Sequence, residues 1–186
     1  MRNISDSDGL HSLIRSFFAD DKIAYLVTPV TSGIRLLHLA KNLGVEPSEV
    51  RNVARDLYEC KVMKPNYEDA AAIASVIRQN GRPLLNPAEL LIPSWQQEDY
   101  IAFFFEVMQR HVGCIYLGSG WEFSRGCLGE VVFGIKLKKP IYDSLGDEID
   151  YDTIYTQIDL ARSKALDAGL DVGYFPVQRE PAAENK

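Results

Sequence analysis

The sequence predicts an α/β fold in which a short parallel sheet is covered by helices on both faces. Short apolar runs alternate with helical segments along the chain, which is the pattern of βαβ units and a parallel sheet. The runs are only four to six residues long and nearly all apolar, as expected of strands that are buried on both faces. The chain has 186 residues, a length that fits one domain.

The first predicted element is an amphipathic helix over residues 5–20. Its large apolar side chains recur at helical spacing and are Leu10, Leu13, Ile14, Phe17 and Phe18. Such a helix can pack on its own domain or contact a second subunit. The first interpretation is favoured, because an apolar stripe usually faces a core.

From residue 23 onward, strands and helices alternate. The predicted strands are residues 23–28, 83–85, 114–117 and 140–142. The predicted helices are residues 34–43, a helix that opens at Pro47, and residues 66–80, 95–110, 128–138 and 150–168. Gly44, Gly81 and Gly169 follow three of these helices, in the place where glycine commonly ends a helix.

Two of these helices have a predicted inner face. In the helix that opens at Pro47, the residues that line up are Val50, Val53, Ala54 and Leu57. In the helix over 66–80, the inward residues are Ala70, Ile73, Ala74 and Ile77. The expected domain organisation is an N-terminal helical segment over 1–22, one α/β domain over 23–175 and a mobile polar tail over 176–186.

Composition excludes several classes of protein. The formal net charge of −6 and the pI near 5.1 argue against a protein that grips a nucleic-acid backbone. No run of about 18 apolar residues predicts a membrane span, and the N-terminus has no apolar core of a signal peptide. The three cysteines are Cys60, Cys114 and Cys127, an odd number without CxxC spacing. We therefore expect a cytoplasmic protein without a disulfide framework, metal or organic cofactor.

Three loops are expected at the carboxyl edge of the sheet, where open α/β sheets bind ligands. They are Pro29–Gly33, Asn86–Glu89 and Gly118–Glu130. The last is rich in glycine, which permits close approach to a ligand, and it leads into a helix N-terminus. With the donors Ser124 and Arg125, it is suited to a phosphate or a sugar hydroxyl. It is neither a Walker loop nor a GxGxxG fingerprint.

Glu130 is expected in the first turn of the helix after this loop. An acidic residue there commonly complements the helix dipole, but its carboxylate also points toward the ligand side. Trp121 is interpreted either as a stacking residue for a base or sugar or as simple loop packing. Asn86 either binds the ligand or forms an Asx-turn before Pro87, and the turn is favoured.

Three segments resemble the nucleoside 2-deoxyribosyltransferase-like superfamily. Residues 24–29 (AYLVTP) are similar to the family's strand-one Y-L-A-G-P, and residues 85–89 (LNPAE) are similar to an N-P-A-E segment in one branch. Residues 120–126 (GWEFSRG), with Glu130 six residues after Ser124, match the family's S-x-G-x-x-x-E spacing and the G-W-E-x-S-x-G form of that branch. The resemblance covers roughly residues 23–142 and implies a Rossmann-like or flavodoxin-like three-layer sandwich.

The resemblance implies an enzyme that acts on the N-glycosidic bond of a nucleoside or nucleoside 5′-monophosphate, as a hydrolase or a transferase. Glu130 matches the family's nucleophile and Tyr25 the tyrosine that positions it. Ser124 and Gly126 match the residues that contact the 5′ side of the sugar or its phosphate. Arg125 slightly favours a phosphorylated substrate and hydrolysis.

Four further site residues complete the expectation. Pro29 ends the strand-one motif, and Asn86 and Trp121 lie on the other two loops. A second family carboxylate falls near Phe105, which makes Glu106 its candidate. Family members often complete their sites across a subunit interface, so a homodimer or higher homo-oligomer is expected.

A non-catalytic nucleotide-binding or scaffold protein of the same fold is the alternative hypothesis. Two departures from the family favour it: Thr28 stands where the family has a strand-one glycine, and Gly113 stands where a strand-three aspartate is common. A phosphoribohydrolase of the lysine-decarboxylase-like type carries little weight, because its P-G-G-x-G-T loop is not in the sequence.

Overall fold

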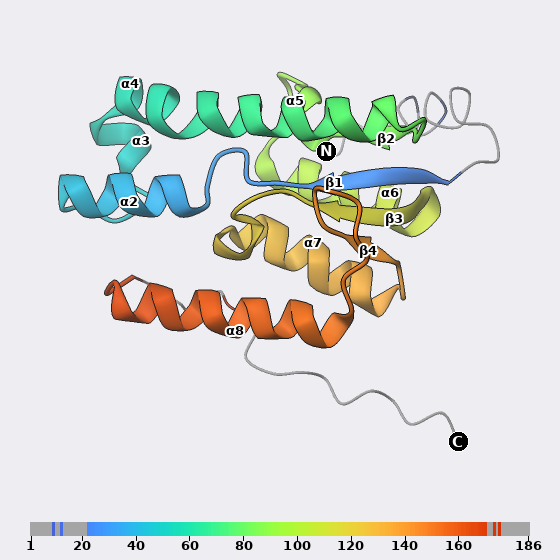
Figure 1. Cartoon of the computed structure of the whole chain (residues 1–186). Coiled ribbons are helices and arrows are strands. Elements are labelled where there is room, and N and C mark those ends of the chain that lie inside the picture. The colour runs from blue at the N-terminus through green and yellow to red at the C-terminus, as the bar shows by residue number, and fades with distance from the viewer. Residues whose placement is uncertain (1–8, 10–11, 13–21, 171–172, 174, 176–186) are drawn as a thin grey trace.

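The computed structural model describes residues 9, 12, 22–170, 173 and 175 (Figure 1). Apart from Gly9 and Ser12, which are helical, the helix predicted over 5–20 lies outside the described residues. The tail over 176–186 lies outside them as well. Among the described residues, no helix is both long and apolar enough to span a membrane.

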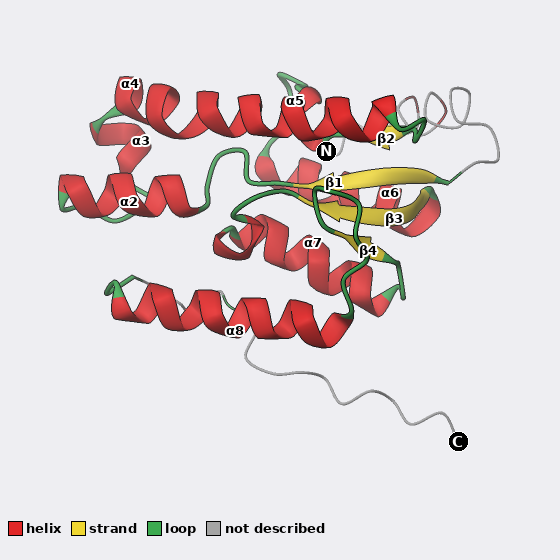
Figure 2. Cartoon of the chain, in the orientation of Figure 1, coloured by secondary structure: helices red, strands yellow, loops and turns green. Residues whose placement is uncertain are grey.

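A four-stranded, all-parallel sheet forms the centre of the fold, as predicted. Its strands are β1 (Ile23–Val27), β2 (Leu84–Leu85), β3 (Val112–Leu117) and β4 (Ile141–Tyr142), in the order β2-β1-β3-β4 (Figure 2). The two central strands share the longest pairing, and Tyr25 stands opposite Ile115. This is the expected Rossmann-like or flavodoxin-like α/β architecture.

Helices cover the two faces of the sheet. On one face α6 (Gln97–Arg110), α7 (Arg125–Lys136) and α8 (Tyr151–Asp167) pack against the larger hydrophobic core. On the other face α5 (Lys64–Gln79) packs through Ala70, Ala74 and Ile77. Residues along β1 alternate between the two cores, as the pleat of a strand requires. Tyr25 therefore belongs to the face of α6 and α7.

The segment between β1 and α5 differs from the prediction. After α2 (Ile34–Leu43), the chain forms two short helices, α3 (Val50–Val53) and α4 (Arg55–Tyr58), instead of one that opens at Pro47. Ala54 breaks the helix with an extended φ of −146°. Val50 is buried as predicted, but Val53 is 60% exposed and Leu57 is 45% exposed. The predicted inner face is therefore wrong.

This segment instead has a small hydrophobic cluster of its own, which is common under long connections. Its buried members are Ala40, Val50, Tyr58 and Val62. The π-helical turn Glu59–Met63 then leads directly into α5. In Figure 1 the helices α2, α3 and α4 lie past the carboxyl end of β1, beside the amino end of α5. This segment therefore borders the edge of the sheet where ligands are expected.

The strand order places a topological switch point between β1 and β3. The connection from β1 leads by way of α5 to β2 on one side, whereas the chain after β3 leads by way of α7 to β4 on the other side. Loops that leave neighbouring strands in opposite directions open a crevice at their carboxyl ends. The loops after β1 and β3 are the ones that meet there.

Candidate active site

Tyr25 and Glu130 form the centre of the candidate site. Tyr25 lies in the middle of β1 with no exposed surface, and its ring meets Phe104 of α6 edge to face, with centroids 5.9 Å apart. Its hydroxyl donates a hydrogen bond of 2.8 Å to Oε1 of Glu130 on α7. The expected pairing of these two residues is therefore present in the structure.

Glu130 lies further along its helix than predicted. The helix α7 begins at Arg125, not at residue 128, so Glu130 stands in the second turn and not in the first. The predicted first-turn placement is wrong. The helix dipole acts mainly within the first turn. Interaction with that dipole is therefore a poor explanation for the presence of a glutamate at position 130.

Partial burial changes the acidity of this carboxyl. Desolvation raises the pKa of Glu130 from its ordinary value of 4.5 to about 7, and the hydrogen bond from Tyr25 works in the opposite direction. Burial of Tyr25 raises the pKa of its own phenol well above the usual value, and the neighbouring charge of Glu130 raises it further. Tyr25 therefore stays protonated and serves as a hydrogen-bond donor. A carboxyl whose pKa is displaced toward neutrality by burial is a candidate functional group.

Ser124 connects the start of α7 to the loop after β1. It is the N-cap of α7, and its Oγ accepts a hydrogen bond of 3.4 Å from the backbone N–H of Cys127. The same Oγ lies 2.8 Å from Oγ of Ser32, in a hydrogen bond that either hydroxyl can donate. Sequence reasoning missed Ser32, because only the folded chain brings it within reach of a residue 92 positions away.

Asn66 of α5 fixes the loop after β1. It is 3% exposed, and its Nδ2 donates to the carbonyl oxygens of Val30 and Ser32 at 3.0 and 3.1 Å. Its Oδ1 accepts from Arg35 at 2.7 Å, and Arg35 also pairs with Asp69 at 2.7 Å. A fully bonded amide at this position holds the loop in one conformation. Nothing in the sequence pattern marks Asn66 as part of the site.

The two loops approach each other through glycines. Gly33 and Gly120 adopt φ values of +86° and +75°, which favour glycine. A Cβ at Gly33 would lie 2.9 Å from Cβ of Pro29, so the buried Pro29 acts as packing for the turn. A Cβ at Gly118 would lie 2.7 Å from Oγ1 of Thr28. The side chain of Thr28 thus occupies the space that Gly118 leaves, and it is only 8% exposed.

The remaining residues of the glycine-rich loop divide into exposed and buried ones. Arg125 and Gly126 are exposed in the first turn of α7, and the side chain of Arg125 makes no hydrogen bond or ion pair with any of the described residues. Trp121 is only 5% exposed and belongs to the larger core, so the loop-packing interpretation holds and the stacking interpretation is wrong for this conformation. Cys127 is also buried, and burial raises the pKa of its thiol well above the usual value, as expected of an unreactive thiol.

Two further predicted site residues have structural partners. Asn86 forms the favoured Asx-turn, since its Oδ1 accepts from the backbone N–H of Ala88 at 3.1 Å. Glu106 forms an ion pair of 2.7 Å with Arg110, one turn along α6. The neighbouring Phe105 stacks on Phe133 of α7 with centroids 4.6 Å apart. Contacts within the chain therefore explain the positions of the Asn86 and Glu106 side chains, and no ligand is needed to explain them.

Gly113 lies away from the candidate site. It is the second residue of β3, at the amino end of the strand, and a Cβ there would lie 2.7 Å from Cβ of Lys22. The candidate site lies at the opposite, carboxyl end of the same strand. The difference from the family at Gly113 therefore does not alter the surroundings of Glu130.

Within the part of the chain that the structure describes, no group of three or more His, Cys, Asp or Glu side chains is placed to hold a metal ion. Comparisons of the chain with models of protein families, with curated proteins and with solved structures give no match.

Proposed function

We propose that this protein cleaves or transfers the N-glycosidic bond of a nucleoside or nucleoside 5′-monophosphate, with Glu130 as the nucleophile. The observation that carries the proposal is the hydrogen bond of 2.8 Å from Tyr25 to the Glu130 carboxyl, at the switch point of a parallel sheet. The resemblance of three segments to nucleoside 2-deoxyribosyltransferase-like enzymes supports the same assignment.

The chemistry needs one carboxylate at a fixed position. Cleavage of an N-glycosidic bond passes through an oxocarbenium-like sugar, and a carboxylate beneath the anomeric carbon stabilises that charge or forms a covalent glycosyl-enzyme. The departing base takes a proton from an acid or from solvent. A second base then resolves the intermediate in a transferase, and water resolves it in a hydrolase.

Tyr25 is the positioning residue in this proposal. Its buried hydroxyl donates to one carboxyl oxygen of Glu130, which leaves the second oxygen available to the sugar. A hydrogen bond to the charged form also favours ionisation, which a nucleophile requires. The pKa of about 7 for Glu130 means that a large fraction of the protein holds the carboxylate at neutral pH.

The start of α7 is the proposed site for the 5′ end of the substrate. Arg125 and Gly126 are exposed there, and a helix N-terminus attracts an anionic group. The exposed guanidinium of Arg125 has no partner among the described residues. These features favour a 5′-phosphate and, with it, hydrolysis over transfer.

One observation favours a second candidate function, nucleotide binding without turnover. Near neutral pH a carboxyl with a pKa of about 7 is protonated in roughly half of the molecules, and a protonated carboxyl binds hydroxyl groups but does not attack carbon. A binding protein of this kind would tolerate Glu130→Gln without loss of affinity.

Release of free base from a panel of nucleosides and 5′-monophosphates tests the proposal. The wild type is compared with Glu130→Gln, which keeps the shape of the side chain and an acceptor for Tyr25. We expect release from at least one substrate and a loss of about 10³-fold or more in the variant, since removal of a nucleophile costs at least that much. Binding of nucleotides without release or base exchange would instead establish the second candidate.

A further inference from the structure

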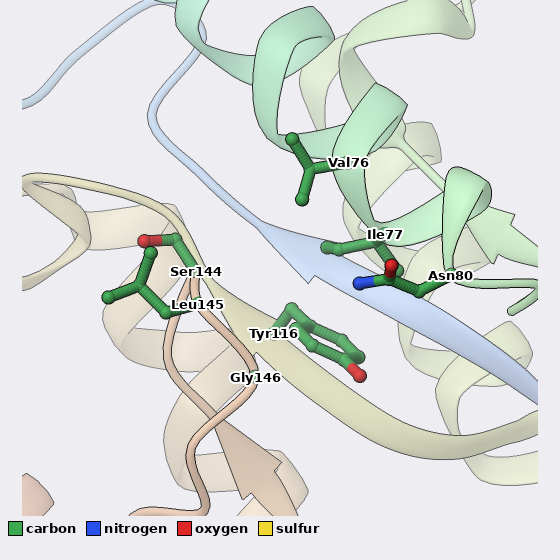
Figure 3. Close-up of a pocket in the computed structure, with 7 residues that line it drawn as sticks. All are labelled: Val76, Ile77, Asn80, Tyr116, Ser144, Leu145 and Gly146. Carbon is green, nitrogen blue, oxygen red and sulfur yellow. The ribbon is translucent and has the colours of Figure 1, made fainter.

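A small hollow lies on the face of the sheet opposite to Tyr25, between α5 and the turn after β4 (Figure 3). Tyr116 of β3 forms part of its lining. Its volume of about 20 Å³ gives room for one water molecule but not for a nucleoside. This hollow therefore cannot hold the proposed substrate, and the loops at the carboxyl edge of the sheet remain the place for it.

The loop after β1 is held through its backbone carbonyl groups. The hydroxyl of Tyr58 donates a hydrogen bond of 2.9 Å to the carbonyl oxygen of Thr31. Asn66 donates to the carbonyl oxygens on either side of that one, which belong to Val30 and Ser32. Three consecutive carbonyl groups of the loop thus face two side chains that are themselves buried.

Tyr58 and Asn66 belong to one continuous helical run. Tyr58 ends α4, the π-helical turn Glu59–Met63 follows without a break, and Asn66 lies in the first turn of α5. Val62, between them, is fully buried and packs with Tyr58 in the small hydrophobic cluster of this segment. In Figure 1 the chain after β1 rises toward this run before it enters α2. The run is therefore a packed support for the loop.

The side-chain amide of Asn66 can take only one orientation. Its Oδ1 accepts a hydrogen bond of 2.7 Å from Arg35, whose guanidinium can only donate. Its Nδ2 faces the two carbonyl oxygens of the loop, which can only accept. Asp69 accepts a hydrogen bond of 2.7 Å from the same guanidinium and so keeps Arg35 in place.

These contacts determine where the backbone N–H groups of the loop point. None of the described peptide bonds is cis, and in a trans peptide the N–H group points away from the carbonyl group of the preceding residue. The N–H groups of Thr31, Ser32 and Gly33 therefore point away from the run of α4 and α5. No residue that the structure describes accepts a hydrogen bond from them. The hydroxyl of Ser32 also meets Ser124, the N-cap of α7.

We propose that Tyr58 and Asn66 are positioning residues, which hold the N–H groups of residues 31–33 free for the anionic 5′ end of the substrate. Their role rests on the proposed function, which places that end at the start of α7. Successive N–H groups that point to one side bind anions, because each carries a partial positive charge. The two side chains also hold three carbonyl oxygens, which would repel a phosphate, on the other side of the loop.

Titration of the nitrogen-labelled protein with ribose 5-phosphate, followed by NMR, tests this role without requiring turnover. We expect the amide signals of residues 31–33 to shift in the wild type. Tyr58→Phe removes only one hydroxyl and should weaken binding about fivefold or more. Asn66→Asp should weaken it about tenfold or more, because a carboxylate oxygen replaces the donor and repels the carbonyl oxygens of Val30 and Ser32.

Tyr151→Phe is the matched control. The hydroxyl of Tyr151 also donates a hydrogen bond of 2.9 Å to a backbone carbonyl oxygen, that of Lys139, which lies just before the amino end of β4. Both tyrosine variants should lower the midpoint temperature of thermal unfolding by a similar amount. Only Tyr58→Phe should weaken the binding of ribose 5-phosphate, so a loss of stability alone does not produce the expected result.

The proposal is overturned if Tyr58→Phe and Asn66→Asp bind ribose 5-phosphate as tightly as the wild type, or if Tyr151→Phe weakens binding equally. Binding that leaves the amide signals of residues 31–33 unmoved would overturn it too, and so would a wild type that does not bind this compound. In each case, release of base from unphosphorylated nucleosides that depends on Glu130 would leave the proposed function intact. The two failures are thus distinguishable.

Discussion

The phenol of Tyr25 and the carboxyl of Glu130 are joined by a hydrogen bond of 2.8 Å across 105 residues of chain. Parallel pairing of β1 with β3 makes this contact possible, since Tyr25 stands opposite Ile115 and the chain after β3 returns as α7. The hydrogen bond thus depends on the topology of the sheet and on the position at which α7 begins. It gives the carboxyl a fixed hydrogen-bond donor on the central strand of the sheet.

Glu130→Gln should stabilise the fold at high pH. The folded-state pKa of about 7 lies above the ordinary 4.5, so the folded chain holds this proton more tightly than the unfolded chain. The resulting stabilisation is complete below about pH 4.5 and is lost as the pH rises through about 7. The variant escapes that loss and should gain about 3 kcal/mol in the free energy of unfolding at pH 8.5.

Urea denaturation at pH 5 and at pH 8.5 measures this gain. At pH 5 the two proteins should differ by less than about 1 kcal/mol, since Glu130 is then protonated and resembles glutamine. Glu68→Gln is the control, because Glu68 lies at the surface of α5 with its side chain 64% exposed. An equal effect of Glu130→Gln at both pH values would contradict the raised pKa.

Tyr25→Phe should shift the titration of Glu130 to higher pH. The variant keeps the aromatic contact with Phe104 but removes the hydrogen bond that favours the carboxylate. We expect the pKa of Glu130 to rise by about one unit, and the rising limb of the pH–rate profile to move with it. Carbon NMR of the labelled carboxyl follows the titration whether or not the protein is active.

Tyr100→Phe is the matched control for that experiment. Tyr100 belongs to the same aromatic cluster, but its hydroxyl bonds to the backbone of Ile92 and not to Glu130. Its loss should leave the titration of Glu130 unchanged. A shift of the same size in both variants would mean that Tyr25 acts only through packing.

Ser124→Ala should reduce both stability and activity. Loss of an N-cap costs about 1 kcal/mol, and the hydroxyl that bonds to Ser32 disappears with it. Asp150→Ala is the control, because Asp150 caps α8 through Thr153 away from the site. The midpoint temperature of thermal unfolding should fall in both variants, whereas the rate of base release should fall only in Ser124→Ala. Similar base release in the two variants would remove Ser124 from the site.

Gly118→Ala should destabilise the protein through Thr28. A Cβ at Gly118 would lie within 2.8 Å of both Oγ1 and Cβ of Thr28, and such overpacking costs about 1–3 kcal/mol. In a Thr28→Gly background most of this cost should disappear, and the remainder comes from the backbone oxygen of Val27, 3.3 Å from the added Cβ. Gly126→Ala is the control, since its nearest neighbour lies 3.9 Å away. A cost at Gly118 that persists without Thr28 would show that another contact is responsible.

The strands and most of the helices follow from local sequence. The uniformly apolar run that ends at Pro29 predicts β1, and Gly44 ends α2 in the left-handed conformation that its residue type favours. These features depend on neighbours in the chain, so a pattern can reveal them. The fold class then follows from the alternation of strands and helices.

The helix boundaries near the site needed the structure. The glycines at 126 and 129 suggest a loop, yet they lie inside α7, because the cap at Ser124 begins the helix before them. A glycine costs a helix only about 1 kcal/mol, and packing of α7 against the core outweighs that cost. The break at Ala54 likewise leaves no mark in the apolar spacing.

Contacts distant in sequence were the least predictable part of the site. Tyr25 and Glu130 could be paired in advance only through the family resemblance. Ser32 and Asn66 carry no motif, and their roles arise from hydrogen bonds of 2.8 to 3.1 Å between separate elements. Trp121 lies on a glycine-rich loop, which suggests that its side chain is exposed. In the structure its indole packs in the larger hydrophobic core.

The assignment of Glu130 as the nucleophile can be tested by trapping the glycosyl-enzyme. A nucleoside with fluorine next to the anomeric carbon disfavours the oxocarbenium-like transition state and slows breakdown of a covalent intermediate. After incubation, mass spectrometry of the intact chain and of its peptides locates the adduct. We expect one fluorosugar per chain, attached to Glu130 and absent in Glu130→Gln. A fluorosugar attached to any other residue, or base release without dependence on Glu130, would contradict it.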